Sequence, residues 1–266
     1  MSAMKEKVVV ITGASKGIGA ELAVQLASLG ARLVLAARDQ QGLEAVAARC
    51  RTAGGAAIAV RADVAEERDC AAIMSGAALA YDGIDVLVNN AGATMWARFE
   101  DIEDLSILDR IMRVNYMGAV HCTKHALPYL RQSKGLLVGI ASLTALTGVP
   151  TRSGYAASKH AMRGFFDSLR IELMGSGVDV TMIYPGFVDT GIRENASGPD
   201  GKPILHTPVK LDMMSVEECA RITVAAIEAR KREVVMTARG KMGTWLKLIA
   251  PGVVDRMAKR VIERGS

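Results

Sequence analysis

Short runs of aliphatic residues alternate along the chain with longer segments whose apolar residues recur at helical spacing. Seven of these runs have the length of a strand and are nearly all apolar, which indicates burial on both faces. They span residues 8–12, 32–37, 57–61, 84–89, 136–141, 179–184 and 233–236. The alternation predicts an α/β, doubly wound fold with a seven-stranded parallel sheet and helices on both faces.

The pattern predicts one main domain, because no linker rich in proline, glycine or serine divides the chain and no repeat of fixed period is present. We assign residues 1–236 to this domain and residues 237–266 to a C-terminal amphipathic helical extension. Within the main domain, residues 187–214 contain several glycines and prolines and show no periodicity. A loop of that length in a compact domain is usually functional, so we expect it to be a substrate lid.

The extension has an apolar stripe on one helical face and charged residues on the other. The apolar residues are Val253, Val254, Met257, Ala258, Val261 and Ile262, and the charged ones are Asp255, Arg256, Lys259, Arg260, Glu263 and Arg264. Such a stripe is expected to pack on its own domain, on a partner protomer or, with Trp245 and its apolar neighbours, on an anionic membrane surface. Protein packing is favoured over peripheral membrane contact, because the stripe is short and its acidic residues weaken attraction to anionic lipid.

Composition excludes several classes of protein. The 266 residues are 50% hydrophobic and 23% charged, which is too apolar for a disordered chain. The net charge of +5 is scattered, and only 2 Trp, 5 Tyr and 4 Phe are present, so we predict no nucleic-acid partner.

Targeting and redox features point to a cytoplasmic protein. The longest uncharged stretch, residues 135–151, is too short and polar to span a bilayer, and the N-terminus lacks the apolar region of a signal peptide. The cysteines, at positions 50, 70, 122 and 219, are widely spaced without a C-x-x-C pair. This spacing favours buried reduced thiols over disulfides or a zinc site.

A glycine-rich segment connects the first predicted strand to the first predicted helix. Its residues Gly13, Ser15, Lys16, Gly17, Ile18 and Gly19 have the spacing G-x-x-x-G-x-G rather than G-x-G-x-x-G. Glycines allow close approach of a pyrophosphate, and a helix N-terminus favours its negative charge. The segment therefore indicates a dinucleotide site in a Rossmann-type fold, with an ordinary tight turn as the alternative.

The end of the second predicted strand carries a cation where an acidic residue often holds the adenosine ribose. Arg38, together with Lys16, is suited to pair with a 2′-phosphate, so NADP is favoured over NAD. The alternative is that Arg38 is solvated and the neighbouring Asp39 binds the ribose.

Tyr155 and Lys159 lie four residues apart in a helical segment, which places both on one face. A cation near a phenol stabilises the phenolate and lowers the phenol pKa, so Tyr155 is suited to exchange a proton with a carbonyl or alcohol oxygen. Ser142, at the end of the fifth predicted strand, is suited to hydrogen-bond that oxygen. A Y-x-x-x-K pair alone is common on helix surfaces, so the inference depends on the whole set.

These motifs, with Asn115 inside a helical segment, follow one another at successive strand ends over residues 5–236. In this order they resemble the short-chain dehydrogenase/reductase family, in its single-domain branch. The resemblance implies that Asn115 anchors a water in a proton relay and that Lys159 also binds the nicotinamide ribose. It further implies cofactor contacts at Asp63, Val64, Asn89, Ala91, Gly92, Pro185, Gly186, Val188 and Thr190. The family commonly forms homodimers or homotetramers through the helices that here contain Asn115 and Tyr155.

The predicted reaction is hydride transfer between NADP(H) and a small apolar carbonyl or secondary alcohol, in the manner of hydroxysteroid dehydrogenases and carbonyl reductases. The apolar character of the substrate is inferred from residues that flank the predicted strand ends and lid: Met95, Trp96, Phe99, Leu143, Val149, Phe187, Met213 and Met214. Core packing is the alternative role for each. A 3-ketoacyl-thioester reductase and a non-catalytic NADP-binding scaffold or sensor are the alternative functions.

One pair of side chains suggests different chemistry. His121 and His125 are spaced to face one metal ion, but the segment lacks the glutamate of H-E-x-x-H and an evident third ligand. We therefore predict no metal site.

Overall fold

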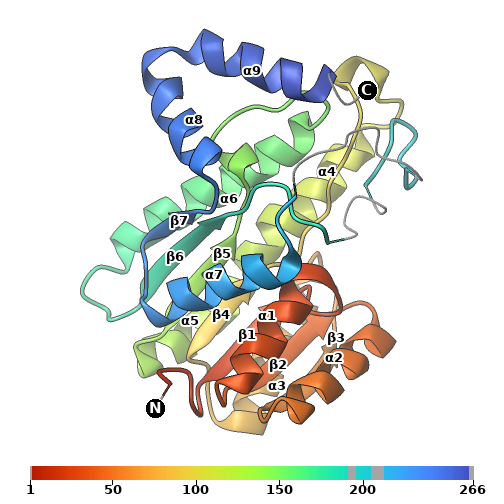
Figure 1. The fold of residues 1–266 in the computed structure, drawn as a ribbon. Helices are drawn as coiled ribbons and strands as arrows, with labels where there is room; N and C mark the ends of the chain where they lie inside the picture. The colour runs from red at the N-terminus through yellow and green to blue at the C-terminus, as the bar shows by residue number, and fades with distance from the viewer. Residues whose placement is uncertain (1, 191–195, 205–212, 264–266) are drawn as a thin grey trace.

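Seven parallel strands form a single sheet in the order β3-β2-β1-β4-β5-β6-β7 (Figure 1). In this computed structural model, residues 2–190, 196–204 and 213–263 are described, with side chains as far as Arg260. The strands are β1 (Val8–Thr12), β2 (Arg32–Ala37), β3 (Ala56–Arg61), β4 (Val86–Asn89), β5 (Leu136–Ile140), β6 (Asp179–Tyr184) and β7 (Glu233–Val235). The predicted doubly wound α/β fold is confirmed, with strand ends that differ from the sequence pattern by at most two residues.

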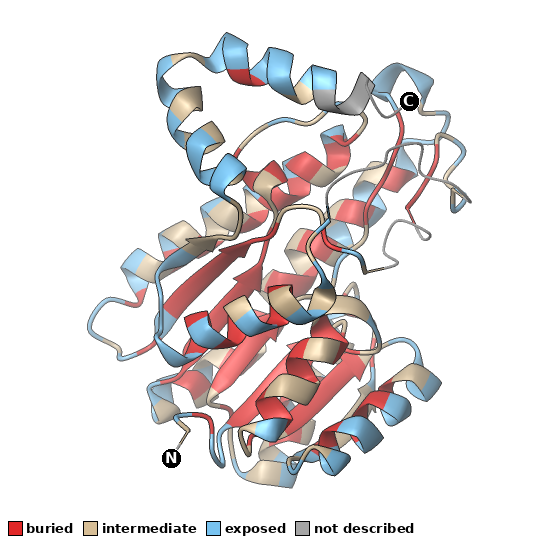
Figure 2. Ribbon diagram, viewed as in Figure 1, coloured by how far each residue is buried: buried red, intermediate tan, exposed pale blue. Residues whose placement is uncertain are grey.

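Helices cover both faces of the sheet (Figures 1 and 2). One face is packed by α1 (Gly17–Ser28), α2 (Gln40–Thr52) and α7 (Val216–Glu228), and the other by α3 (Glu67–Tyr81), α5 (Gly118–Ser133) and α6 (Ser153–Glu172). Strand β1 shows why its sequence is apolar throughout. Val9 and Ile11 enter the first core, whereas Val10 enters the second, so neither face of the strand meets water.

Shorter elements lie above the carboxyl ends of the strands. They are η1 (Phe99–Asp101), α4 (Ser106–Met112), the π-helical η2 (Arg113–Met117) and η3 (Leu143–Ala145). The connections that carry η2 and η3 follow β4 and β5, respectively. This edge of the sheet therefore gathers side chains that are far apart in the sequence.

The predicted lid, 187–214, is described only at residues 187–190, 196–204 and 213–214. Gly191 and Pro208, two of its predicted turn residues, lie outside the described residues. Within the described part, Val188 pairs with Met214, and Ser197 exchanges backbone hydrogen bonds with Thr94 and Trp96. The segment around residue 197 therefore packs on the loop that follows β4.

All four cysteines are buried free thiols, in agreement with the predicted reduced state. Burial raises the pKa of Cys50 to about 11 and that of Cys219 to about 12. Thiols with such pKa values are poor nucleophiles at neutral pH.

The C-terminal extension forms α8 (Ala238–Ile249) and α9 (Pro251–Glu263), which lie beyond the sheet in Figure 1. It contacts the main domain at defined points: Lys247 Nζ donates to the Leu146 carbonyl at 2.9 Å, and a Cβ on Gly240 would lie 2.6 Å from Leu143 Cδ2.

The apolar stripe of the extension is only partly covered. Val254 is buried, whereas Val253 and Met257 are 38% and 47% exposed. On α8, Trp245 and Ile249 are exposed as well. The side chains of Val261, Ile262 and Arg264, which the sequence places on the two faces, lie outside those described. Among the described residues, no helix combines the length and apolar character needed to cross a membrane.

We predict that truncation after Arg239 lowers the free energy of unfolding or changes the oligomeric mass, because it removes the Lys247 anchor and the buried Val254. Urea denaturation and light scattering measure both quantities. Trp245→Ala, which changes an exposed side chain of the same extension, is the control for stability. Unchanged stability and mass combined with lost co-sedimentation on anionic liposomes would instead assign the extension to a membrane surface.

Candidate active site

The glycine-rich turn between β1 and α1 has a backbone that only glycine adopts easily. Gly13 and Gly17 have φ values of +66° and +58°. A Cβ on Gly13 would lie 2.8 Å from Ala91 Cα, and one on Gly19 would lie 2.5 Å from the Gly13 carbonyl oxygen. The turn therefore packs directly on the segment that follows β4, with no room for a side chain at Gly13 or Gly19. Such a cradle fits a dinucleotide pyrophosphate.

Asn90 braces this turn. Its Nδ2 donates to the Thr12 carbonyl at 2.9 Å and to the Gly13 carbonyl at 3.1 Å. In return, Thr12 Oγ1 accepts from the backbone N–H groups of Asn90 and Ala91. Asn90 was not among the predicted site residues, although it lies between Asn89 and Ala91. The polar pair that ends an otherwise apolar strand is the sequence signal that indicates it.

The segment after β6 closes over the same turn. A Cβ on Gly17 would lie 3.1 Å from Thr190 Cβ, and the Pro185 carbonyl accepts from the backbone N–H of Leu143 at 3.0 Å. Val188 is buried, and Gly186 packs against Thr237. The structure thus brings Thr190 next to the glycine turn, whereas Pro185 and Gly186 contact Leu143 and Thr237.

The carboxyl end of β2 leads into Arg38 and Asp39, the two charged residues that the sequence singles out at this strand end. The exposed Arg38 places Nη1 3.8 Å from Asp63 Oδ2. Asp39 has a different role, because its Oδ1 accepts from the Gly42 backbone N–H at 3.0 Å and caps α2. Lys16 is exposed immediately before α1, whereas Val64 is buried beside Gly118. Because both side chains are exposed, Arg38 and Lys16 are accessible to a bound anion.

Asn115 connects three parts of the site. It is 1% exposed within η2. Its Oδ1 accepts from the Ala93 N–H at 2.7 Å, and its Nδ2 donates to the Ala93 carbonyl at 2.9 Å and to Ser158 Oγ at 2.8 Å. Ser158 Oγ donates in turn to the Tyr155 carbonyl at 2.7 Å. The Asn115 side chain therefore fixes the segment beside Gly92 to the first turns of α6. Asn89 lies deeper and donates to Thr123 Oγ1 at 3.2 Å.

Lys159 is a buried cation at the centre of the site. Its Nζ donates to the Ile140 carbonyl at 2.9 Å and lies 5.9 Å from the centroid of the Tyr155 ring. A Cβ on Gly92 would lie 3.8 Å from the same Nζ. Burial lowers the pKa of Lys159 to about 8, because the ammonium loses water contacts that one carbonyl does not replace.

Tyr155 and Ser142 place two hydroxyl groups next to each other in the site. Ser142 Oγ accepts from the Thr144 N–H at 3.2 Å, and a hydrogen bond from Ser142 also acts on the Tyr155 hydroxyl. Burial raises the pKa of Tyr155, whereas the Arg152 charge and the Ser142 hydrogen bond lower it, and the net direction is upward. The sequence-based expectation of a pKa lowered by Lys159 is therefore wrong, because desolvation of the phenol outweighs the lowering groups, which are Arg152 and Ser142.

The apolar residues predicted to line a substrate pocket lie in different surroundings in the structure. Met95 is fully buried in a small core with Ile107 and Ile111, and Phe99 is 64% exposed. Trp96, in contrast, packs in a small cluster with Ala196, Val149 and Ile204 near the lid segment. Both Met95 and Trp96 lie next to the lid, since Met95 forms a β-bridge with Ser197 and Trp96 packs on Ala196 and Ile204.

His121 and His125 do not form part of a larger ligand set. His125 Nε2 lies 3.2 Å from Glu67 Oε1. Over residues 2–190, 196–204 and 213–260, no three His, Cys, Asp or Glu side chains are grouped closely enough to hold a metal ion.

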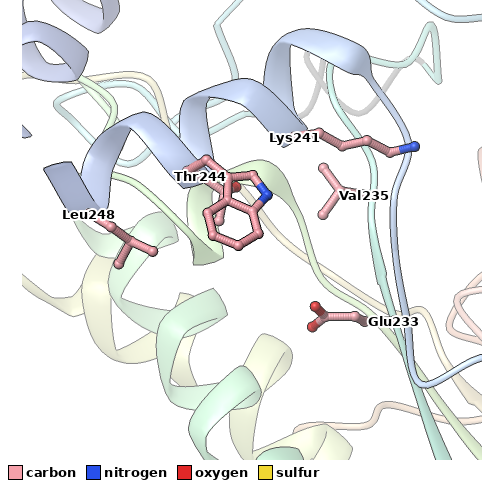
Figure 3. Close-up of a pocket in the computed structure, with 6 residues that line it drawn as sticks. Glu233, Val235, Lys241, Thr244 and Leu248 are labelled. Carbon is pink, nitrogen blue, oxygen red and sulfur yellow. The ribbon is translucent and has the colours of Figure 1, made fainter. Parts of the chain in front are cut away.

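A separate cavity of about 350 Å³ lies between β7 and α8 (Figure 3). Glu233, Val235, Lys241, Thr244, Trp245 and Leu248 line it. Because its lining comes from the sheet edge and the extension, the cavity is distinct from the site around Tyr155.

Comparison with known proteins shows a family to which the chain is similar. The family model described as short chain dehydrogenase matches residues 7–200. The 11-beta-hydroxysteroid dehydrogenase-like 4A protein of Arabidopsis thaliana is 38% identical over 255 residues, which are 96% of this chain and 84% of the relative.

Two solved structures show the same fold. A short chain dehydrogenase/reductase from Burkholderia phymatum in complex with NAD is 26% identical, has a TM-score of 0.84 and aligns over 95% of this chain and 96% of its own. An alcohol dehydrogenase from Thermococcus sibiricus complexed with 5-hydroxy-NADP is also 26% identical. It has a TM-score of 0.75 and aligns over 86% of this chain and 95% of its own.

The lowered pKa of Lys159 predicts a stability signature in the protein without cofactor. Between about pH 8 and pH 10.5 the unfolded chain binds a proton at this lysine that the folded chain has released, so stability rises with pH. The difference in unfolding free energy between Lys159→Met and wild type should therefore shift in favour of wild type by roughly 2–3 kcal/mol across this range.

Urea denaturation at several pH values measures this difference, and Lys124→Met, at an exposed lysine on α5, is the matched control. A difference that stays constant from pH 8 to pH 10.5 would contradict the burial of a titrating ammonium.

Proposed function

Because the chain belongs to the short-chain dehydrogenase/reductase family, we propose that it is an NADP-dependent oxidoreductase acting on an apolar ketone or aldehyde and the matching secondary or primary alcohol. Family membership makes it an oxidoreductase that acts on CH–OH groups. The choice of NADP, the apolar substrate and the role of each residue are proposals.

The observation that carries the proposal is the convergence of Ser142, Tyr155 and Lys159 beside a glycine turn that fits a pyrophosphate. The three side chains come from the end of β5 and the first turns of α6. When bound, a nicotinamide dinucleotide supplies or accepts the hydride. In this proposal the residues of the turn, with Ser15 and Ile18, hold the pyrophosphate, and those at positions 185–190 receive the nicotinamide end.

The proton moves between Tyr155 Oη and the substrate oxygen. Ser142 Oγ, which already interacts with the Tyr155 hydroxyl, is positioned to hydrogen-bond the same oxygen and to orient the carbonyl. Lys159 contributes positive charge near the phenol and can bind the nicotinamide ribose. Asn115 has a structural role in this proposal, since its hydrogen bonds to Ala93 and Ser158 connect α6 to the segment after β4.

The exposed Arg38 guanidinium supports the choice of NADP. It lies at the carboxyl end of β2, where the adenosine ribose is expected, and the capping bond made by Asp39 engages the acidic group that would otherwise favour NAD. Lys16 adds a second cation at the start of α1. Asp63, which faces Arg38 at 3.8 Å, keeps the guanidinium near this corner.

The remaining parts of the proposal concern the substrate and the assembly. Trp96 and Val149 pack with the lid residue Ile204 in one apolar cluster, and we propose a small apolar substrate on the basis of this apolar packing under the lid. The homodimer or homotetramer and the cytoplasmic location inferred from the sequence remain predictions.

We predict that Tyr155→Phe lowers turnover by about 10²- to 10⁴-fold while NADPH affinity is retained, because the variant lacks the transferable proton. Ser142→Ala should lower turnover in the same direction. Oxidation of NADPH with a panel of apolar ketones and aldehydes measures turnover, and fluorescence titration measures binding. Tyr129→Phe, at a half-buried tyrosine on α5, is the control. Near-normal turnover by Tyr155→Phe would exclude the assigned role.

The cofactor prediction is that wild type binds NADPH more tightly than NADH and that Arg38→Asp abolishes or reverses this preference through repulsion of the 2′-phosphate. Dissociation constants for both cofactors provide the measurement. Arg131→Asp makes the same charge change in the last turn of α5 and should leave the preference intact. Equal affinities of the wild type for NADH and NADPH would show that Arg38 does not recognise the phosphate.

A further inference from the structure

Arg152 is a buried cation that the sequence did not single out. Arg152 is 7% exposed and occupies the N-cap position of α6, three residues before Tyr155. Its Nη1 donates to Thr94 Oγ1 at 3.0 Å, and its guanidinium carbon lies 4.4 Å from the centroid of the Trp96 ring. These contacts, from a loop nearly 60 residues away in sequence, hold the guanidinium in one place.

That place is beside the candidate acid. The guanidinium carbon lies 5.8 Å from the centroid of the Tyr155 ring, compared with 5.9 Å for Lys159 Nζ. Two cations therefore flank one phenol at similar distances, one from the N-cap of α6 and the other from its second turn.

The two cations differ in how firmly they keep their charge. Burial lowers the pKa of Lys159 to about 8, so this ammonium loses its proton in mildly alkaline solution. A guanidinium stays protonated throughout the pH range in which proteins fold. Above about pH 8, Arg152 is the flanking group that retains a full positive charge.

Among residues 2–190, 196–204 and 213–260, the other elements packed around Tyr155 direct their charged groups elsewhere. The neighbouring cluster of Met95, Ile107 and Ile111 is apolar. On α4, Arg110 is directed to Ser197 and the Gly201 carbonyl, and Asp109 is exposed. From α8, Lys247 donates to the Leu146 carbonyl. Ser142 is neutral and acts through its hydrogen bond. In agreement with this arrangement, the charge of Arg152 lowers the pKa of Tyr155.

We propose that Arg152 is a positioning residue for proton transfer, whose permanent charge stabilises the Tyr155 phenolate. Thr94 and Trp96 keep the guanidinium at the distance at which its field acts on the phenol. The catalytic consequence rests on the proposed function, but the electrostatic coupling between Arg152 and Tyr155 does not depend on turnover.

The coupling can be measured directly by ¹⁹F NMR on protein labelled with 3-fluorotyrosine, since fluorination lowers phenol pKa values towards the range in which the fold persists. The chain has 5 tyrosines, and Tyr155→Phe identifies the resonance of Tyr155. We expect Arg152→Gln to raise the pKa of the labelled Tyr155 by about one unit or more, a change of at least tenfold in its ionisation constant. Arg152→Lys should restore most of this shift.

Two further variants keep the test decisive. Arg152→Met removes the charge but preserves apolar packing on Trp96. Thr94→Val removes the hydrogen bond that holds the guanidinium but leaves its charge, so we expect this variant to raise the Tyr155 pKa by a smaller amount. Arg163→Gln is the matched control, because it removes an arginine on α6 whose guanidinium carbon lies 5.9 Å from the ring of a different tyrosine, Tyr184. This control should leave the Tyr155 resonance unshifted.

A Tyr155 pKa that is unchanged in folded Arg152→Gln and Arg152→Met protein, or in Thr94→Val if neither of these folds, would overturn the proposal. In the alcohol-oxidation direction, the alkaline shift should also appear in the pH profile of kcat, with recovery in Arg152→Lys. If the resonance shifts but Tyr155→Phe retains full turnover, the electrostatic coupling holds and the proposed function fails. The two inferences can therefore be distinguished.

Discussion

Strand β1 pairs in parallel with both β2 and β4, and the candidate site depends on this arrangement. The chain leaves β1 towards one edge of the sheet through β2 and β3, and later returns to build the other half from β4 to β7. Loops therefore diverge above β1 and β4 and leave space at the carboxyl ends of these strands. The Thr12 and Asn90 hydrogen bonds close the base of that space, so the glycine turn is supported by the opposite half of the sheet.

Buried positive charge gives this space its chemistry. Lys159 and Arg152 are 3% and 7% exposed, and each is held by a hydrogen bond to a neutral oxygen. Placing a cation in such surroundings costs free energy, and the field it exerts is stronger there than in water. The same desolvation opposes ionisation of Tyr155, so the phenol depends on nearby cations to become a useful acid and base. We regard this balance as the central physical feature of the site.

The sequence predicts most of the fold, because strands such as β1 and β2 are buried on both faces and therefore have continuous apolar runs. It places β4 two residues too early, because Ile84 extends the apolar run to a position before the strand begins. The sequence also predicts that residues directly after strand ends, such as Ser142 and the glycine turn, lie at the same edge of the sheet. Arg152 has no such signal, since its burial results from contacts with Thr94 and Trp96 that only the tertiary structure creates. Asn90 is similar, because the sequence shows a polar residue but not which carbonyls it binds.

In the proposed function, this chain transfers hydride to a carbonyl carbon. The most direct measurement uses NADPH that carries deuterium at the transferable C4 position of the nicotinamide, incubated with the protein and a panel of apolar ketones. Mass spectrometry of the products then locates the label. Our account predicts an alcohol with one deuterium on the former carbonyl carbon. NADPH that binds to the protein while no ketone in the panel yields a labelled alcohol would contradict the account and indicate a binding protein without hydride transfer.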